Sequence, residues 1–414
     1  MTETAILAAS GLLLFAYLVD IVGRRFKLPS VVLLIATGIA LRYAMDPAGL
    51  NLKWVDPIVP ILGTLGLVLI VLEGALDLTI SRDRARLIVA SSASAALGFG
   101  VALAGIAMLC TWSVGMTPAA AVLAAIPFAV ISSAVAIPSA AGLRDRVREF
   151  VIYESSLSDI IGVLVFYSWL GANGSIPDFA ADLFGSGALS LVAALVVAPV
   201  VFYVINRIDG HVRFLPLLAA IVCLYAGGKV LHLSPLVLVL VCGLLLNNPH
   251  LIRWHVWLRS IHSDEYGQTL KEFKGLVAEL TFATKSFFFL MLGYWTDVRL
   301  MGGASAWMTA IAVIAVIYAS RFVVLRSLRR EVAELLWIAP RGLITVLLFL
   351  SAGHTGTVDA FPFGAVMLIV LATSTATALA HRQAARRAAE ATPEKADSNV
   401  SGPAISAASQ TASE

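Results

Sequence analysis

Apolar residues in this chain gather into long runs that are separated by charged or Gly/Pro-rich breaks. A helix needs about 20 apolar residues to cross roughly 30 Å of hydrocarbon, and most of these runs reach that length. The runs cover approximately residues 5–22, 29–45, 57–78, 87–111, 117–141, 150–170, 187–206, 213–231, 234–247, 273–297, 304–325, 332–351 and 360–381. This pattern predicts an all-α polytopic membrane protein with about 13 transmembrane helices. The ninth run is short, and the stretch 250–268 is either a loop or a helix along the membrane interface.

Two of the runs carry helix-breaking residues in their middle. The fifth run contains Pro127 and Pro138 on either side of a Ser-Ser pair, and the twelfth run contains Pro340 and Gly342. The third and tenth runs are separated by seven positions in the order of the runs, as the fifth and twelfth are. Both the third and the tenth close with a Gly and then an Asp. Interrupted helices at matching positions of two inverted halves point to the midplane site of a secondary transporter. We therefore predict two inverted repeats with discontinuous helices 5 and 12, although Pro and Gly also occur in ordinary membrane helices.

The composition excludes several classes of protein. Of the 414 residues, 59% are hydrophobic and 13% are charged, and the mean hydropathy is +0.90. Soluble domains are roughly 45–50% apolar and about 25% charged, so a large soluble enzyme, a disordered chain and a nucleic-acid binder are excluded. Membrane lipid is the expected surrounding. Because Cys110, Cys223 and Cys242 stand singly in apolar runs, we predict no disulfide framework, no zinc site and no cofactor.

The chain divides into two parts. Residues 1–388 contain all the apolar runs and form the predicted transmembrane domain. Residues 389–414 are rich in Ala and Ser without apolar periodicity, and they form a predicted disordered cytoplasmic tail. We expect no attached soluble domain, and therefore we do not expect the protein to be an enzyme.

Positive charges indicate the orientation, because cytoplasmic loops collect Lys and Arg. With the N-terminus outside, four of the 29 Lys and Arg residues fall on the external side and two fall inside apolar runs. All the others fall on the cytoplasmic side. We therefore predict a multi-pass protein of the cell membrane with its N-terminus outside and its C-terminus in the cytoplasm.

Four charged residues lie deep inside apolar runs, where each costs several kcal/mol unless it is neutralised. They are Glu154, Asp159, Lys285 and Arg341. Asp159 lies about 13 Å from the cytoplasmic start of its run, near the bilayer midplane. Since Arg prefers a bidentate carboxylate partner, we interpret Glu154 and Arg341 as a structural ion pair. Lys285 is either a competing charge that modulates the site or a structural anchor.

Asp159 is the favoured functional residue. Ser155 and Ser158 flank it, which suits a polar, hydrated cavity. Burial favours the protonated form of a carboxyl group, so this side chain could exchange a proton for a small cation. By contrast, we expect Glu73 to face cytoplasmic water and Arg321 to extend to the lipid headgroups.

Five segments resemble those of a known family in their order and spacing. LPSVVLLIATGIALR (28–42) resembles "LP-x-V-x-x-x-x-x-G", and VLEGALDL (71–78) resembles "FEGGL-x-L". ESSLSDIIG (154–162) resembles "ESLLND-x-x-G". KSFFFLMLG (285–293) and APRGLITVLL (339–348) resemble "FFF-x-x-LG" and "x-RG-x-x-x-x-x-L". Over about 10–385 the chain is thus similar to the monovalent cation:proton antiporters, in the bacterial sodium/proton exchanger branch that includes the animal sodium/hydrogen exchangers.

The resemblance implies a homodimer in which a core domain moves like an elevator against a dimer domain. It also implies that Asp159 is the shared proton and cation site, and that Glu154 pairs with Arg341. Two positions depart from the family pattern: Ser158 replaces Asn or Asp, and Ser133 replaces the acid of "TDPVAV". Potassium/proton relatives also carry Ser-Ser at the second place, so the choice between Na⁺, Li⁺ and K⁺ stays open.

The leading hypothesis is a secondary antiporter that exchanges Na⁺, Li⁺ or K⁺ for H⁺, one for one and electroneutrally. A hard cation prefers oxygen ligands, which freed backbone carbonyls and nearby hydroxyls would supply beside Asp159. Those hydroxyls belong to Ser132, Ser133, Ser155 and Ser158. Lys285 changes the stoichiometry if it also releases a proton in each cycle. The alternatives are a channel-like or organic-solute carrier on the same scaffold, and a transport-inactive sensor or assembly partner.

Overall fold

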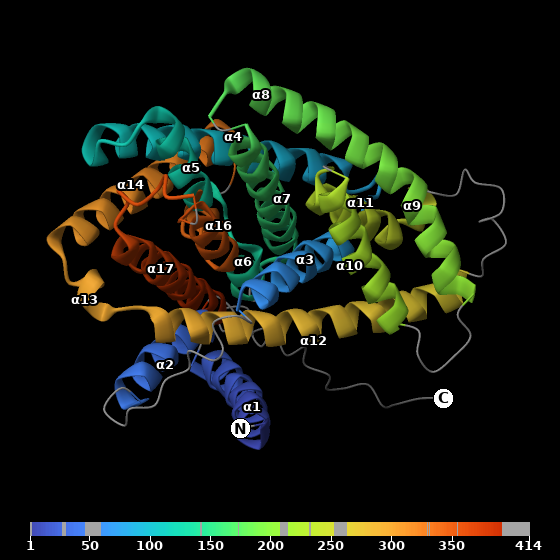
Figure 1. Cartoon of the computed structure of the whole chain (residues 1–414), viewed down its shortest axis with the longest axis horizontal. Coiled ribbons are helices and arrows are strands. Elements are labelled where there is room, and N and C mark those ends of the chain that lie inside the picture. Colours follow the sequence, from blue (N-terminus) through green and yellow to red (C-terminus); the bar gives the residue numbers. More distant parts are fainter. Residues whose placement is uncertain are drawn as a thin grey trace, which may run out of the picture.

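The computed structural model of the chain is helical throughout its described part (Figure 1). It describes residues 2–26, 30–45, 59–140, 143–172, 174–207, 214–231, 233–251, 263–328, 330, 332–353 and 355–390. These residues form helices, turns and loops and no strand, which confirms the predicted all-α class. Most of the predicted tail, residues 391–414, lies outside the described residues, as does 252–262 of the predicted interfacial stretch.

The helices follow one another in two halves of the described chain. The first half contains α1 (Thr2–Phe26), α2 (Ser30–Met45), α3 (Val59–Asp77), α4 (Ala85–Leu109), η3 (Cys110–Val114), α5 (Pro118–Ala129), α6 (Ser133–Ser139), α7 (Asp145–Gly171), α8 (Ile176–Ala181), η4 (Asp182–Ser186) and α9 (Gly187–Arg207). The second half contains α10 (Phe214–Val230), α11 (Pro235–Asn247), η5 (Pro249–Leu251), α12 (Ser263–Trp295), α13 (Val298–Met301), α14 (Ala304–Ser327), α15 (Val332–Leu335), α16 (Leu343–Gly353) and α17 (Phe363–Glu390).

Each predicted apolar run falls on at least one of these helices. In the described part of the chain, seven helical stretches are long and apolar enough to cross a membrane. They are Ala85–Val114, Pro118–Ser139, Asp145–Gly171, Ile176–Val201, Tyr266–Trp295, Ala304–Ser327 and Phe363–Ala380. Further apolar helices are shorter. The multi-pass architecture is therefore confirmed, whereas the count of 13 crossings and the inverted relation of the two halves stay predictions.

Both predicted helix breaks are present. Residues 130–132 are extended and separate α5 from α6. Residues 336–342 are likewise non-helical and separate α15 from α16. Pro340 contributes to the second break, because it has no N–H to donate and disfavours helical geometry at the residue before it.

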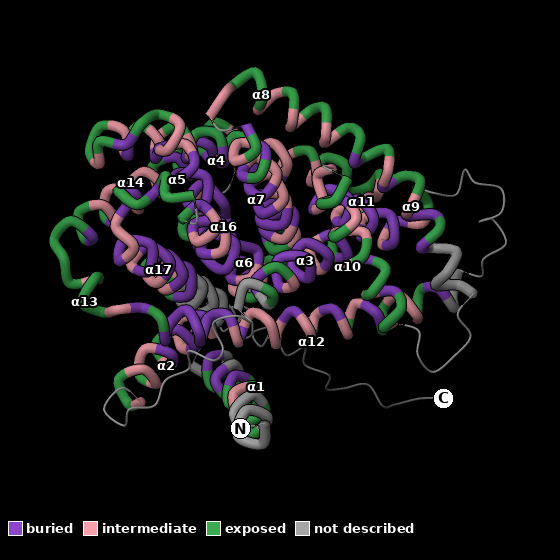
Figure 2. Tube along the Cα trace, viewed as in Figure 1, coloured by how far each residue is buried: buried purple, intermediate pink, exposed green. Residues whose placement is uncertain are grey.

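The helices pack into two groups. We call α4–α7 with α14–α17 the broken-helix bundle, and α1–α3 with α9–α12 the flanking bundle. Packing is dense within each bundle, as between α4 and α7 or between α2 and α12, and sparse where α7 meets α3 and α11. Figure 2 shows buried positions along α5, α7 and α16 and many exposed positions along α8 and α9. The broken helices and α7 therefore form the buried centre of the molecule.

The helices α2 and α12 cross with their backbones in contact at two glycines. A Cβ atom on Gly38 would collide with the Leu290 carbonyl oxygen, and a Cβ atom on Gly293 would collide with that of Ile35. Small residues at such crossings let membrane helices approach closely. These two glycines thus tie α2 to α12 within the flanking bundle.

Candidate functional site

The non-helical segments of the two broken helices meet in the centre of their bundle. The Ser132 N–H donates to the Pro340 carbonyl oxygen at 3.0 Å. A Cβ atom on residue 342 would lie 2.6 Å from Ser132 Oγ, so glycine at this position leaves the hydroxyl its space. Helix ends leave backbone donors and acceptors without intrahelical partners. At this crossing the two breaks satisfy some of those groups for each other.

Asp159 faces the first break from α7 and is 5% exposed. The Ser133 N–H donates to Asp159 Oδ2 at 3.0 Å, and the Ser133 hydroxyl also interacts with this carboxyl group. Asp159 Oδ1 and Ser132 Oγ are buried, and neither has a hydrogen-bond partner among the residues that the structure describes. The carboxyl group is therefore held by one oxygen, while the other oxygen can take up a proton or a cation.

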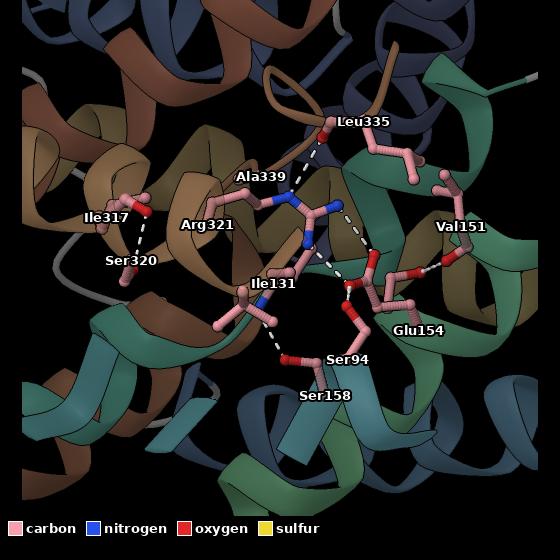
Figure 3. A network of polar contacts seen from close by, with 12 residues as sticks. Ser94, Ile131, Val151, Glu154, Ser158, Ile317, Ser320, Arg321, Leu335 and Ala339 are labelled. Atoms are coloured by element: carbon pink, nitrogen blue, oxygen red, sulfur yellow. Dashed lines mark hydrogen bonds and ion pairs between the residues drawn. The ribbon is translucent and has the colours of Figure 1, made fainter. Parts of the chain in front are cut away.

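The other two predicted serines lie on the same helix and bind backbone groups. Ser158 Oγ accepts a hydrogen bond from the Ile131 N–H at 2.9 Å, so it anchors the break to α7 (Figure 3). Ser155 Oγ donates to the Val151 carbonyl oxygen of its own helix at 2.7 Å, which leaves the hydroxyl lone pairs able to accept. The structure thus places Ser132 and Ser133 at the first break, Ser158 against it, and Ser155 one turn before Asp159 on α7.

Gly162 lets α7 approach the first break. A Cβ atom at this position would collide with the Val130 side chain. Gly162 lies one turn after Ser158 on α7, so the two residues share the face that meets the break. The spacing of serine, aspartate and glycine along α7 therefore places all three against the same non-helical segment.

Glu154 does not pair with Arg341, which corrects the predicted ion pair. Arg321 of α14 donates to Glu154 through two nitrogens, Nη1 to Oε1 at 2.7 Å and Nη2 to Oε2 at 2.8 Å (Figure 3). Ser94 of α4 donates its hydroxyl to the same carboxylate, and Arg321 Nε donates to the Leu335 carbonyl oxygen. Arg321 is 5% exposed, so the expectation that it extends to the headgroups is also wrong. The bidentate ion pair joins α7 to α14, and the Ser94 hydrogen bond adds α4.

Arg341 instead binds carbonyl groups that the helix breaks leave free. Its Nε donates to the Phe128 carbonyl oxygen at 2.6 Å, and its Nη1 donates to that of Ala339 at 2.9 Å. Its backbone is held by Thr373 and Ser374 of α17. The carbonyl end of a helix carries partial negative charge, so the C-terminus of α5 can accommodate a buried guanidinium without a carboxylate. The sequence offers no spacing that distinguishes this partner from an acid.

Lys285 pairs with Glu73 across the interface of α12 and α3. Lys285 Nζ lies 3.4 Å from Glu73 Oε2, and both side chains are mostly buried. Glu73 therefore does not face cytoplasmic water alone, contrary to the expectation. Lys285 also interacts electrostatically with Asp159, although it belongs to the flanking bundle. The pair is consequently a structural link within the flanking bundle, and the part of Lys285 in modulating Asp159 stays a prediction.

A cavity of about 1290 Å³ lies between the two bundles near the C-terminal end of α7. Residues of both bundles line it, including Tyr167 of α7, Tyr225 of α10 and Leu347 of α16. Tyr167 is eight residues beyond Asp159, which is about 12 Å along a helix. The cavity thus approaches the carboxyl group from one side of the molecule without including it.

The donor set around Asp159 suits a small monovalent cation or a proton. Within the described ranges, no group of three or more His, Cys, Asp or Glu residues is placed to hold a metal ion. The groups that converge here are one carboxylate, neutral hydroxyls and backbone amides of the broken helices. A single negative charge with neutral oxygens can balance one positive charge, which is the requirement for alternating proton and cation binding.

Comparisons with known proteins bear on the family and the fold of the chain. The family model described as "Sodium/hydrogen exchanger, transmembrane" matches residues 11–391. No curated protein matches the chain. Among solved structures, the sodium proton antiporter MjNhaP1 from Methanocaldococcus jannaschii at pH 8 is similar at a TM-score of 0.73 and 19% identity, covering 94% of this chain and 97% of that one. An electron-microscopy structure of the same antiporter gives 0.71 and 19%, covering 95% and 99%.

Proposed function

Because this chain belongs to the sodium/hydrogen exchanger family, we propose that it exchanges a monovalent cation for a proton at Asp159. The carrying observation is that Asp159 is buried against the first helix break, with Oδ2 held by Ser133 and Oδ1 without a partner in the described structure. Na⁺ is the expected cation, with Li⁺ or K⁺ as alternatives. K⁺ remains an alternative cation because Ser133 of the Ser-Ser pair in the first break stands where the family pattern has an acid.

Competition for one carboxyl group couples the two ions. Removing a carboxylate from water favours its protonated form unless a cation compensates the charge. Proton and cation therefore exclude each other from Asp159, and each can leave only when the other binds. Exchange rate should then peak at an intermediate pH, since protons outcompete the cation at low pH and become scarce at high pH.

Neighbouring charges support one-for-one, electroneutral exchange. Glu154 is neutralised by Arg321, and Glu73 lies beside Lys285, so among the described residues Asp159 is the buried acid that has an oxygen without a partner. One proton in one direction then balances one cation in the other. If Lys285 released a proton in each cycle, the exchange would instead move net charge.

The sparse packing between the bundles supports an elevator-like movement. The broken-helix bundle carries Asp159 together with its backbone and serine partners, so it can move as a unit past the flanking bundle. The cavity beside Tyr167 would bring water towards the site from one side. We infer that the protein works in the cell membrane as a homodimer with its N-terminus outside. Cross-linking of engineered cysteines would test the homodimer, and protease accessibility in intact cells would test the orientation.

Purified protein in proteoliposomes tests the proposal with a trapped pH dye. Addition of Na⁺, K⁺ or Li⁺ outside should drive proton efflux from acid-loaded vesicles, and Asp159→Asn should abolish it. Asp178→Asn is the matched control, because Asp178 is exposed at the start of α8. Full exchange by Asp159→Asn would overturn the site. Net current without counter-transport would indicate a channel-like carrier, and absence of both would indicate a sensor.

A further inference from the structure

Residues on different faces of α7 contact different parts of the molecule. Each residue turns the helix by about 100°, so Glu154, Ser158, Asp159 and Ser156 follow one another around it in that order. Glu154 meets α4 and α14, whereas Ser158 and Asp159 meet the first break. Ser156 is next in this sequence and meets the flanking bundle. A Cβ atom on Gly74 of α3 would lie 4.0 Å from both Ser156 Cβ and Oγ.

Ser156 is buried without a hydrogen-bond partner. The residue is 2% exposed, and its Oγ has no partner in the described part of the chain. Its neighbour Ser155 and the buried Ser91 of α4 both donate to carbonyl groups of their own helices. A buried hydroxyl normally makes such a bond, and an exception needs an explanation.

In the described structure, most buried side-chain atoms that lack a hydrogen-bond partner belong to the first break or to α7. Five side-chain atoms are of this kind in the described structure. Three of them belong to Ser132, Ser156 and Asp159, and the remaining two are Tyr318 Oη and Arg330 Nε. All three of the first group are oxygens, and Ser156 lies one turn before Asp159. Oxygens with free lone pairs beside an anionic group are the ligands that a hard cation uses.

Packing alone does not require a hydroxyl at this position. An alanine here would keep the contact with Gly74 through its Cβ atom and would bury no polar atom. A serine instead buries an oxygen that has no partner among the described residues, which costs free energy unless something binds it.

We propose that Ser156 Oγ is a ligand of the cation bound at Asp159, which it approaches from the side of α3. The inference rests on the proposed function. Residues three apart on a helix have Cβ atoms about 5–6 Å apart, so one cation can contact side-chain oxygens of both. Ser156 then places the cation at the seam of the two bundles, where α7 meets α3. An added neutral oxygen raises the coordination number, which benefits Na⁺ and K⁺ more than Li⁺.

Exchange kinetics of Ser156→Ala test this ligand. We expect the KM for Na⁺ and K⁺ to rise about fivefold, the effect of one lost neutral contact, with a smaller rise for Li⁺ and an unchanged maximal rate. Ser156→Thr retains the hydroxyl and should restore the KM. Ser91→Ala removes an equally buried hydroxyl from α4 and should change none of these values. An equal change for all three ions, or no rescue by threonine, would show a packing role and overturn the proposal.

Gly74→Ala gives an independent test without deleting a polar group. The added methyl would contact the Ser156 side chain and reduce the space beside its hydroxyl. We expect the KM for K⁺ to rise more than that for Na⁺, because K⁺ is larger. If Ser156→Ala and Gly74→Ala leave KM unchanged while Asp159→Asn abolishes exchange, the ligand is refuted and the antiporter stands. If the unmodified protein exchanges no cation, both proposals fail.

Discussion

Glu154 and Asp159 are two buried acids on the same helix, five residues apart, with opposite surroundings. Glu154 is 1% exposed and receives two bonds from Arg321 and one from Ser94. Asp159 is 5% exposed and has one oxygen without a partner among the described residues. Burial is therefore not what distinguishes a structural acid from an ion-carrying one. The number of fixed partners is what separates them, and substitutions at each acid and its neighbours test this distinction.

The largest expected effect is on transport by Asp159→Asn. The amide cannot bind a proton or balance a cation, so exchange should fall by roughly 100-fold or more. The thermal unfolding midpoint in detergent should not fall, because no fixed ion pair is lost and a neutral group replaces a buried acid. A fall of many degrees would show that Asp159 is instead a structural acid like Glu154.

The second effect, on stability, comes from Glu154→Gln. Removing one member of a buried ion pair leaves Arg321 uncompensated, and we expect a loss of about 3–5 kcal/mol in unfolding free energy. Thermal unfolding in detergent measures it. The double variant Glu154→Gln with Arg321→Gln removes both charges and should recover part of the loss. Equal instability of the double variant would contradict the assigned pairing.

Arg341→Lys should have a smaller effect on stability. Lysine keeps the charge but cannot reach the Phe128 and Ala339 carbonyl groups in the same planar geometry, so we expect a loss of about 1–3 kcal/mol. The same unfolding assay applies. If Arg341→Lys behaved like Glu154→Gln, an acidic partner for Arg341 would have to be reconsidered.

Lys285→Gln should alter cation binding as well as stability, because it also breaks the pair with Glu73. The ammonium group competes with a cation at Asp159, so its removal should lower the KM for Na⁺ about two- to threefold. Exchange kinetics at several Na⁺ concentrations measure this change, with membrane potential imposed to detect any change in stoichiometry. A tenfold loss of maximal rate would indicate that Lys285 carries a proton itself.

The smallest effect is expected at the surface pair of Arg144 and Glu334. Arg144 Nη2 lies 2.7 Å from Glu334 Oε1, the same distance as in the Glu154 pair, but both side chains are at least one-third exposed. Exposed pairs contribute about 0–1 kcal/mol, and salt screens them. Glu334→Gln should therefore shift the unfolding midpoint by no more than a few degrees. A larger shift would show that distance, and not burial, sets the strength of these pairs.

Much of the architecture is predictable because lipid imposes strong rules on a chain. Backbone groups in hydrocarbon must be satisfied internally, so long apolar runs form helices wherever they occur. The proline, glycine and serine positions in the fifth and twelfth runs predict both breaks. The run around Asp159 also predicts the central acid with its serines, since helical spacing fixes which residues share a face.

Depth along the helices gives only a weak signal for the partner of Glu154. The helical rise predicts similar depths for Asp159 and Arg341, and a position closer to the predicted cytoplasmic side for Glu154. Arg321 lies six residues before the end of α14, at a comparable distance from that side. The polar pair Ser320-Arg321 inside an apolar run is the available signal, although its position near the end of the run 304–325 equally suits an arginine that reaches the headgroups.

The sequence by itself determined which segments are helical and where two of them break, and it predicts that Asp159 lies near the midplane. These are local properties, set by hydrophobicity, by proline and glycine geometry, and by the rise of a helix. Only the tertiary structure decided that Arg321 neutralises Glu154, that Arg341 binds carbonyl groups, and that Ser156 faces α3 with an unpaired oxygen. Such pairings depend on the rotation and approach of helices far apart in the chain, which packing of the whole molecule determines.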